Sequence, residues 1–165
     1  MKRLRRFVPA CALALAACAP PVPQVKPAAP EKFSCAAARD ADFEGEGEQQ
    51  LHAYLAWLAV NHGKPGLEPS QVSLAIVRTY PKPGPAGVQV GEISCNADDY
   101  RITLYRNALA GRPLAVAYET LAHEFHHIVQ IRRDRLACEA RKGERAAYER
   151  EATEFARKRV PSCKR

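Results

Sequence analysis

The sequence predicts a small α+β domain, because helical and strand-like patterns alternate along it. Apolar residues recur at intervals of three and four around residues 49–61, which indicates an amphipathic helix. Residues 72–80 are rich in β-branched side chains and partly alternate, which indicates a strand. Two more helical patterns follow, at about residues 112–135 and 144–159. The length of 165 residues, with 47% hydrophobic and 26% charged residues, fits one globular domain.

The first half of the chain combines a helix with short strands. The helix ends near Gly63, a residue type that often terminates helices, and its apolar face comprises Leu51, Tyr54, Leu55 and Leu58. The proline- and glycine-rich residues 81–87 predict a loop. Strands are therefore predicted on both sides of this loop, at 72–80, 93–95 and 100–105.

The second half of the chain is predicted to be helical. Pro113 is suited to the first turn of a long helix, where its missing N–H has no partner to lose. That helix runs to about Arg135. A last helix covers about 144–159 and stops before Pro161.

The N-terminus resembles a bacterial lipoprotein signal peptide. A basic segment at residues 1–6 precedes an apolar run that is too short to cross a bilayer. The run ends in Leu-Ala-Ala-Cys18, which resembles the lipobox in which the cysteine is lipidated and becomes the first mature residue. Cleavage after Ala19 is an alternative, but it would leave Pro20 directly after the cut. A buried N-terminal helix is a second alternative, but it leaves the basic segment unexplained.

These observations predict three regions. A signal peptide covers 1–17, the lipidated Cys18 and a proline-rich tether cover 18–34, and the folded domain covers 35–165. By resemblance to known lipoproteins, Ala19 after the cysteine favours the outer membrane, with the domain facing the periplasm.

The net charge argues against a nucleic-acid partner. The whole chain carries 25 Lys+Arg and 18 Asp+Glu, a formal charge of +7. Four of the basic residues lie in the predicted signal peptide, so the mature chain carries only +3.

The cysteines fit an oxidising compartment. Once Cys18 is assigned to the lipid, the mature chain keeps four others, and an even number in an exported chain predicts two disulfides. Three pairings are open, and none of the spacings is the CxxC of thiolate zinc sites or redox motifs. The candidates are Cys35, Cys95, Cys138 and Cys163.

An HEFHH segment in the long helix predicts a metal site. HExxH on a helix places His123 and His127 one turn apart on the same face, ready to bind one metal ion, with Glu124 as a general base. At ~100° per residue, His127 lies ~40° and Glu124 ~100° from His123. The apolar residues Leu114, Leu121, Phe125 and Ile128 fall at ~140–200°, on the other side of the helix. Two imidazoles with a carboxylate favour zinc.

The third ligand is predicted in the last helix. No glycine or histidine follows His127 at the metzincin positions, so that class is excluded. Glu151 shares an apolar stripe with Tyr148, Ala152 and Phe155, whereas Glu149 points ~160° away and is expected to face solvent. A carboxylate in such a stripe is costly unless it meets a cation, so Glu151 is the predicted ligand. The alternative is that Glu151 is a partly exposed charge paired with an arginine.

The two motifs together resemble those of small gluzincin-like metallopeptidases, including the ImmA/IrrE-like proteins. Leu121-Ala-His-Glu-Phe-His-His127 matches their HExxH helix, and Glu151-Ala-Thr-Glu-Phe-Ala156 matches the E-A-x-x-F-A helix that supplies the third ligand. The match covers roughly a fifth of the chain and departs from the family at Thr153, where Asp or Asn is common. The resemblance implies a small twisted sheet whose edge strand lies along the cleft, and residues 100–105 are expected to be that strand.

These inferences converge on a monomeric, envelope-tethered zinc metallopeptidase that hydrolyses a peptide or protein substrate. Glu124 would take a proton from a zinc-bound water and pass it to the leaving amine. A second hypothesis is a catalytically silent, zinc-stabilised lipoprotein that acts as a binding or assembly module. An intact Glu124 argues against it, since a structural site needs no base.

Overall fold

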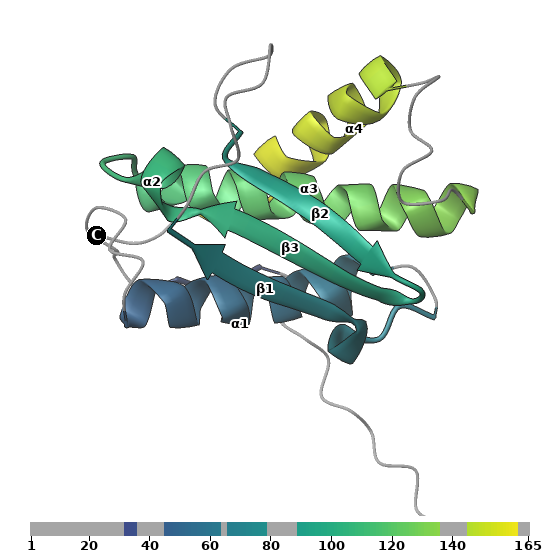
Figure 1. Cartoon of the computed structure of the whole chain (residues 1–165), viewed down its shortest axis with the longest axis horizontal. Helices are drawn as coiled ribbons and strands as arrows, with labels where there is room; N and C mark the ends of the chain where they lie inside the picture. Colours follow the sequence, from purple (N-terminus) through teal and green to yellow (C-terminus); the bar gives the residue numbers. More distant parts are fainter. Residues whose placement is uncertain (1–31, 36–44, 64–65, 79–88, 136–144, 162–165) are drawn as a thin grey trace, which may run out of the picture.

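The computed structural model describes residues 32–35, 45–63, 66–78, 89–135 and 145–161 (Figure 1). The predicted signal peptide, Cys18 and residues 79–88 lie outside these ranges, as does most of the tether. The described elements are α1 (Glu46–His62), the 3-10 helix η1 (Pro69–Gln71), β1 (Val72–Val77), β2 (Gly91–Asn96), β3 (Asp99–Tyr105), α2 (Arg106–Leu109), α3 (Leu114–Asp134) and α4 (Arg145–Arg157).

The α+β prediction is confirmed: a three-stranded mixed sheet packs against helices. The strand order is β1-β3-β2, with β1 parallel and β2 antiparallel to β3. Helix α3 contacts β2 and β3, α1 contacts β1, and both helices lie on one face of the sheet (Figure 1). Helix α4 packs on α3.

One strand prediction was wrong. Residues 100–105 were expected to form the edge strand, but they belong to β3, which is the central strand. Its Tyr100, Ile102 and Leu104 are buried beneath the helices and alternate along the strand with the more exposed Arg101 and Thr103. The edge strand that lies on α3 is β2.

The predicted core faces of the two long helices are confirmed. The four residues of the predicted apolar face of α1 are at most 4% exposed, as are Leu114, Leu121, Phe125 and Ile128 of α3. Tyr54 of α1 and Tyr118 of α3 join the helices through an edge-to-face contact with ring centroids 4.9 Å apart. Helix α3 thus lies in the middle of the domain, in contact with α1, α4 and the sheet.

The helix ends follow their predicted residues closely. Gly63 caps α1 by donating its N–H to the Ala59 carbonyl at 3.1 Å. Helix α3 starts directly after Pro113 and ends at Asp134, and the following Arg135 caps it with a left-handed φ of 52°. None of the helices in the described ranges is long and apolar enough to span a membrane.

Two of the four predicted disulfide cysteines are described. Cys35 and Cys95 are both disulfide-bonded, and Cys35 is buried in the core. Cys138 and Cys163 lie outside the described residues. The pairing of the four cysteines therefore stays a prediction.

Candidate metal centre

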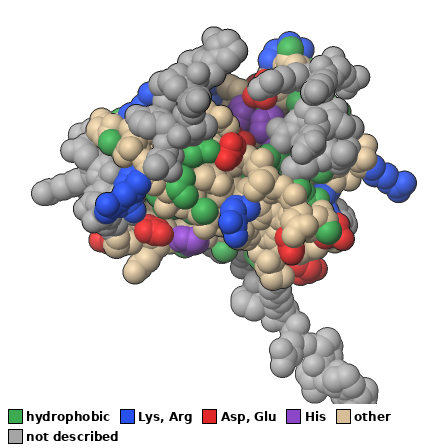
Figure 2. Space-filling view, in the orientation of Figure 1, with side chains coloured by type: hydrophobic (Ala, Val, Ile, Leu, Met, Phe, Trp, Pro, Cys, Tyr) green, Lys and Arg blue, Asp and Glu red, His purple; other side chains and the backbone are tan. Residues whose placement is uncertain are grey.

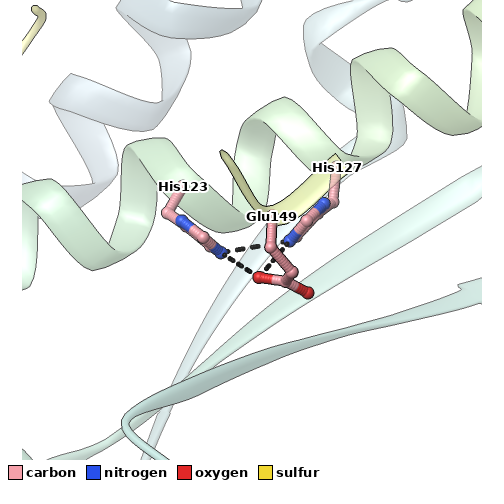
Figure 3. Close-up of side chains that lie close together, drawn as sticks. All are labelled: His123, His127 and Glu149. Atoms are coloured by element: carbon pink, nitrogen blue, oxygen red, sulfur yellow. Dashed lines mark hydrogen bonds and ion pairs between the residues drawn. The ribbon is translucent and has the colours of Figure 1, made fainter. Parts of the chain in front are cut away.

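Two imidazoles from α3 and one carboxylate from α4 converge at the centre of the site (Figure 3). His123 and His127 lie one turn apart, as HExxH predicts, and both direct Nε2 toward Glu149. His127 is buried, while the side chains of His123 and Glu149 are 22% and 41% exposed. The group is open to solvent on one side. Figure 2 shows histidine atoms at the surface beside acidic ones.

The distances between the three donor atoms fit one metal ion. His123 Nε2 lies 3.1 Å from His127 Nε2 and 3.1 Å from Glu149 Oε2, and the third distance, from His127 Nε2 to Glu149 Oε2, is 3.6 Å. Tetrahedral zinc with bonds of about 2.0–2.1 Å holds its ligands about 3.3–3.4 Å apart. The observed triangle brackets that separation, so a zinc ion fits with small adjustments of the side chains.

The structure places a different carboxylate beside the histidines from the one predicted, about half a helical turn away on α4. Glu149 was expected to face solvent, yet its carboxylate lies against both imidazoles. Glu151, the expected ligand, is not part of the group. Its Oε1 lies 2.6 Å from Arg133 Nη1, which is the ion pair that the sequence left open as the alternative.

The Arg133 guanidinium keeps Glu151 ionised. Its hydrogen bonds are the main reason that the pKa of Glu151 falls to about 2, against the opposing effect of burial, while Gln130 and His126 lower the pKa further. Glu151 therefore serves as an ionic link between α4 and α3. The ion pair with Arg133 compensates the cost of partly burying this carboxylate, so Glu151 needs no metal ion.

The face of α4 that carries Glu149 includes two buried alanines. Ala152 and Ala156 are fully buried, and they follow Glu149 at intervals of three and seven. Alanines allow the two helices to approach closely, so the glutamate one turn before them is carried to the histidines. A glutamate followed by alanines three and seven residues later is the sequence pattern that could have placed Glu149 on the buried face of α4.

The third histidine of the HEFHH segment takes no part in the group. His126 is buried, with its ring stacked on Phe155 at 4.3 Å and its Nε2 3.1 Å from Glu151 Oε1. Burial lowers the pKa of His126 in spite of the neighbouring carboxylate. At His123, the ring Nδ1 makes a long contact of 3.5 Å with Thr153 Oγ1. The families that the chain resembles often carry an acid or an amide at the position of Thr153.

The predicted base, Glu124, follows His123 and lies beside β2. A Cβ on Gly91 of that strand would be 3.3 Å from Glu124 Cγ, so the backbone of β2 passes directly over this side chain. Gly91 was not singled out in the sequence. Its lack of a side chain brings the edge strand next to the base.

We expect Gly91→Ala to destabilise the protein, because the new Cβ would lie 2.8 Å from Thr120 Cγ2 and 3.2 Å from Leu104 Cδ2. Thr120 has little freedom to turn away, since its hydroxyl donates to the Val116 carbonyl at 2.8 Å. Overpacking of this kind costs about 1–3 kcal/mol, measurable by urea unfolding. Adding Thr120→Ser removes the clashing methyl and keeps the hydroxyl, so the double variant should recover stability. A Gly91→Ala variant as stable as the wild type would contradict this close contact.

Comparison with known proteins adds no family to this geometry. No family model, no curated protein and no solved structure matches the chain.

Proposed function

We propose that this protein is a zinc-dependent metallopeptidase. The proposal rests mainly on the triangle formed by His123, His127 and Glu149, whose edges suit tetrahedral zinc. A glutamate stands directly after the first histidine, where HExxH peptidases carry their base. The HExxH part of the resemblance to small gluzincins supports the same activity. The E-A-x-x-F-A part does not, because Glu149 rather than Glu151 lies with the histidines.

The number of ligands favours a catalytic over a structural site. The described group offers three protein donors, which leaves one corner of a tetrahedron open. Structural zinc sites are usually closed by four protein ligands, whereas catalytic sites keep a position for water or substrate. Bound zinc supplies Lewis-acid chemistry, lowering the pKa of a coordinated water and polarising the scissile carbonyl.

Glu124 is the proton carrier in this proposal. It accepts a proton from the attacking water and delivers it to the amine of the departing peptide. The backbone of β2 at Gly91 lies close to Glu124, which is of intermediate exposure on α3.

The substrate is a peptide or protein bound along β2. Among the described strands, β2 has a neighbour on one side only. An extended peptide can add to such an edge through backbone hydrogen bonds. Because β2 passes over Glu124 at Gly91, a peptide on this edge would run past the metal centre.

The chain is further proposed to be a monomer tethered to the outer membrane through lipid on Cys18, with the domain in the periplasm. This part rests on the sequence of the leader. The disulfide-bonded state of Cys35 and Cys95 agrees with an oxidising compartment.

The choice of ligand is tested by comparing Glu149→Gln with Glu151→Gln. Glu149→Gln should weaken zinc binding by more than about 100-fold, since even residues that merely support a ligand typically contribute 10–100-fold. Glu151→Gln should bind zinc nearly as well as the wild type, because the amide keeps an oxygen that can accept from Arg133 or Gln130. Zinc affinity is measured by competition with a chelator. The reverse order of the two variants would show that Glu151 is the ligand.

A further inference from the structure

Gln130 is a fully buried polar residue next to the metal centre, and the proposed mechanism gives it no role. It lies on α3 three residues after His127 and is 2% exposed. Burying an amide is costly unless its polar atoms are hydrogen-bonded. Both ends of this amide have partners, and those partners belong to the two helices that build the site.

On α3, the amide oxygen faces a histidine of the site. Gln130 Oε1 lies 2.7 Å from His127 Nδ1, and this contact is buried. On α4, Gln130 Nε2 donates to the Tyr148 carbonyl at 3.0 Å and to Glu151 Oε2 at 3.1 Å. Both groups on α4 only accept hydrogen bonds, so the NH₂ must face α4 and the oxygen must face His127.

This orientation decides the tautomer of His127. Because the amide oxygen can only accept, Nδ1 must carry the hydrogen of the imidazole and donate it. In the neutral ring Nε2 then presents a lone pair toward His123 and Glu149. A metal ion requires this tautomer, and a hydrogen bond at the other ring nitrogen is the usual way to fix it.

The same amide also holds the segment of α4 that carries Glu149. Tyr148 immediately precedes Glu149 and Glu151 follows two residues later, so the two acceptors flank the proposed ligand. Arg133 binds the same Glu151 carboxylate at 2.6 and 3.2 Å, which strengthens the link between the helices.

We infer that Gln130 is a positioning residue of the metal centre, which fixes the tautomer of His127 and, through α4, the place of Glu149. This inference rests on the proposed zinc site. Through its two ends, this side chain connects a histidine on α3 with the segment of α4 that carries the carboxylate.

Gln130→Met tests the inference, because methionine has a similar length and unbranched shape but replaces the amide with a weak thioether acceptor. Zinc affinity is measured by chelator competition, and the absorption spectrum of the Co²⁺-loaded protein reports ligand geometry. We expect zinc to bind roughly 10–100-fold more weakly, and the Co²⁺ bands to shift. The matched control is Ile128→Val on the same helix, which removes one fully buried methyl group. It should lower stability but leave zinc affinity and the Co²⁺ spectrum unchanged.

The outcomes separate this inference from the proposed function. If the wild type takes up no zinc, the metal centre itself is wrong and the role of Gln130 falls with it. If the wild type binds zinc and Gln130→Met matches it in affinity and spectrum, only the positioning role is wrong.

A measurement without substitution covers the case in which Gln130→Met does not fold. Imidazole ¹⁵N chemical shifts of the metal-free wild type, with its fold verified by circular dichroism, should show the hydrogen of His127 on Nδ1. A hydrogen on Nε2 would overturn the inference.

Discussion

Replacing His127 by Ala is expected to abolish zinc binding and to lower stability more than any other single change at the site. The variant loses one of three protein ligands, and metal binding is linked to folding. It also leaves the buried Gln130 oxygen without its partner at 2.7 Å. At a free zinc concentration 1,000 times the dissociation constant, the linkage alone amounts to about 4 kcal/mol. Metal content after dialysis and melting curves with and without a chelator measure both effects.

His126→Ala is the matched control for this result. His126 is a buried neighbour on the same helix, but it contacts Phe155 and Glu151 rather than the other two imidazoles. This variant should lose stability through the cavity while retaining one zinc per chain, and a chelator should still lower its melting temperature. A His127→Ala variant that keeps stoichiometric zinc would contradict the assignment.

Glu124→Gln is expected to separate metal binding from catalysis. Glutamine keeps the size of the side chain but cannot accept a proton at neutral pH, and Glu124 is not part of the ligand group. Zinc should remain at one per chain and the melting temperature should barely move. Peptidase activity, assayed on a mixture of unstructured peptides, should fall roughly 10²–10⁴-fold, the usual contribution of general acid–base catalysis.

Glu119→Gln serves as the control for that assay. Glu119 lies on the same helix, and its half-exposed carboxylate is 3.8 Å from the Arg157 guanidinium. Activity should be unchanged in this variant. If Glu124→Gln leaves a verified activity intact, the catalytic mechanism is wrong and a zinc-stabilised binding module takes its place.

The parts of the fold that follow from local periodicity were predictable. The faces of α1 and α3 are set by side chains three and four residues apart, and each predicted core residue on them is buried. The spacing of His123 and His127 is equally local, so the helix alone brings the two rings together.

The order of the strands was not predictable from such patterns. β1 and β3 pair in parallel although β2 lies between them in the sequence. Alternation in residues 100–105 shows that one face is buried, but both a central and an edge strand can satisfy it. No local sequence pattern indicated that the edge strand β2 would approach α3 at Gly91.

The carboxylate beside the histidines was not predicted, because the apolar stripe of Tyr148, Ala152 and Phe155 favoured Glu151 over Glu149. Phe155 does face α3, but it stacks on His126 rather than defining the side that carries the ligand. Ala152 and Ala156 are fully buried, and the face of α4 that they share includes Glu149. How α4 crosses α3 depends on non-local bonds such as that of Arg133 with Glu151, which the sequence offered only as an alternative.

The central claim is that His123, His127 and Glu149 together bind one zinc ion. Its most direct test is anomalous X-ray diffraction, above and below the zinc absorption edge, on crystals of the mature chain purified without added metal. One peak should lie about 2.0–2.2 Å from Nε2 of each histidine and from an oxygen of Glu149. A structure with no zinc between these three side chains, or with zinc bound by Glu151 in place of Glu149, would contradict the account.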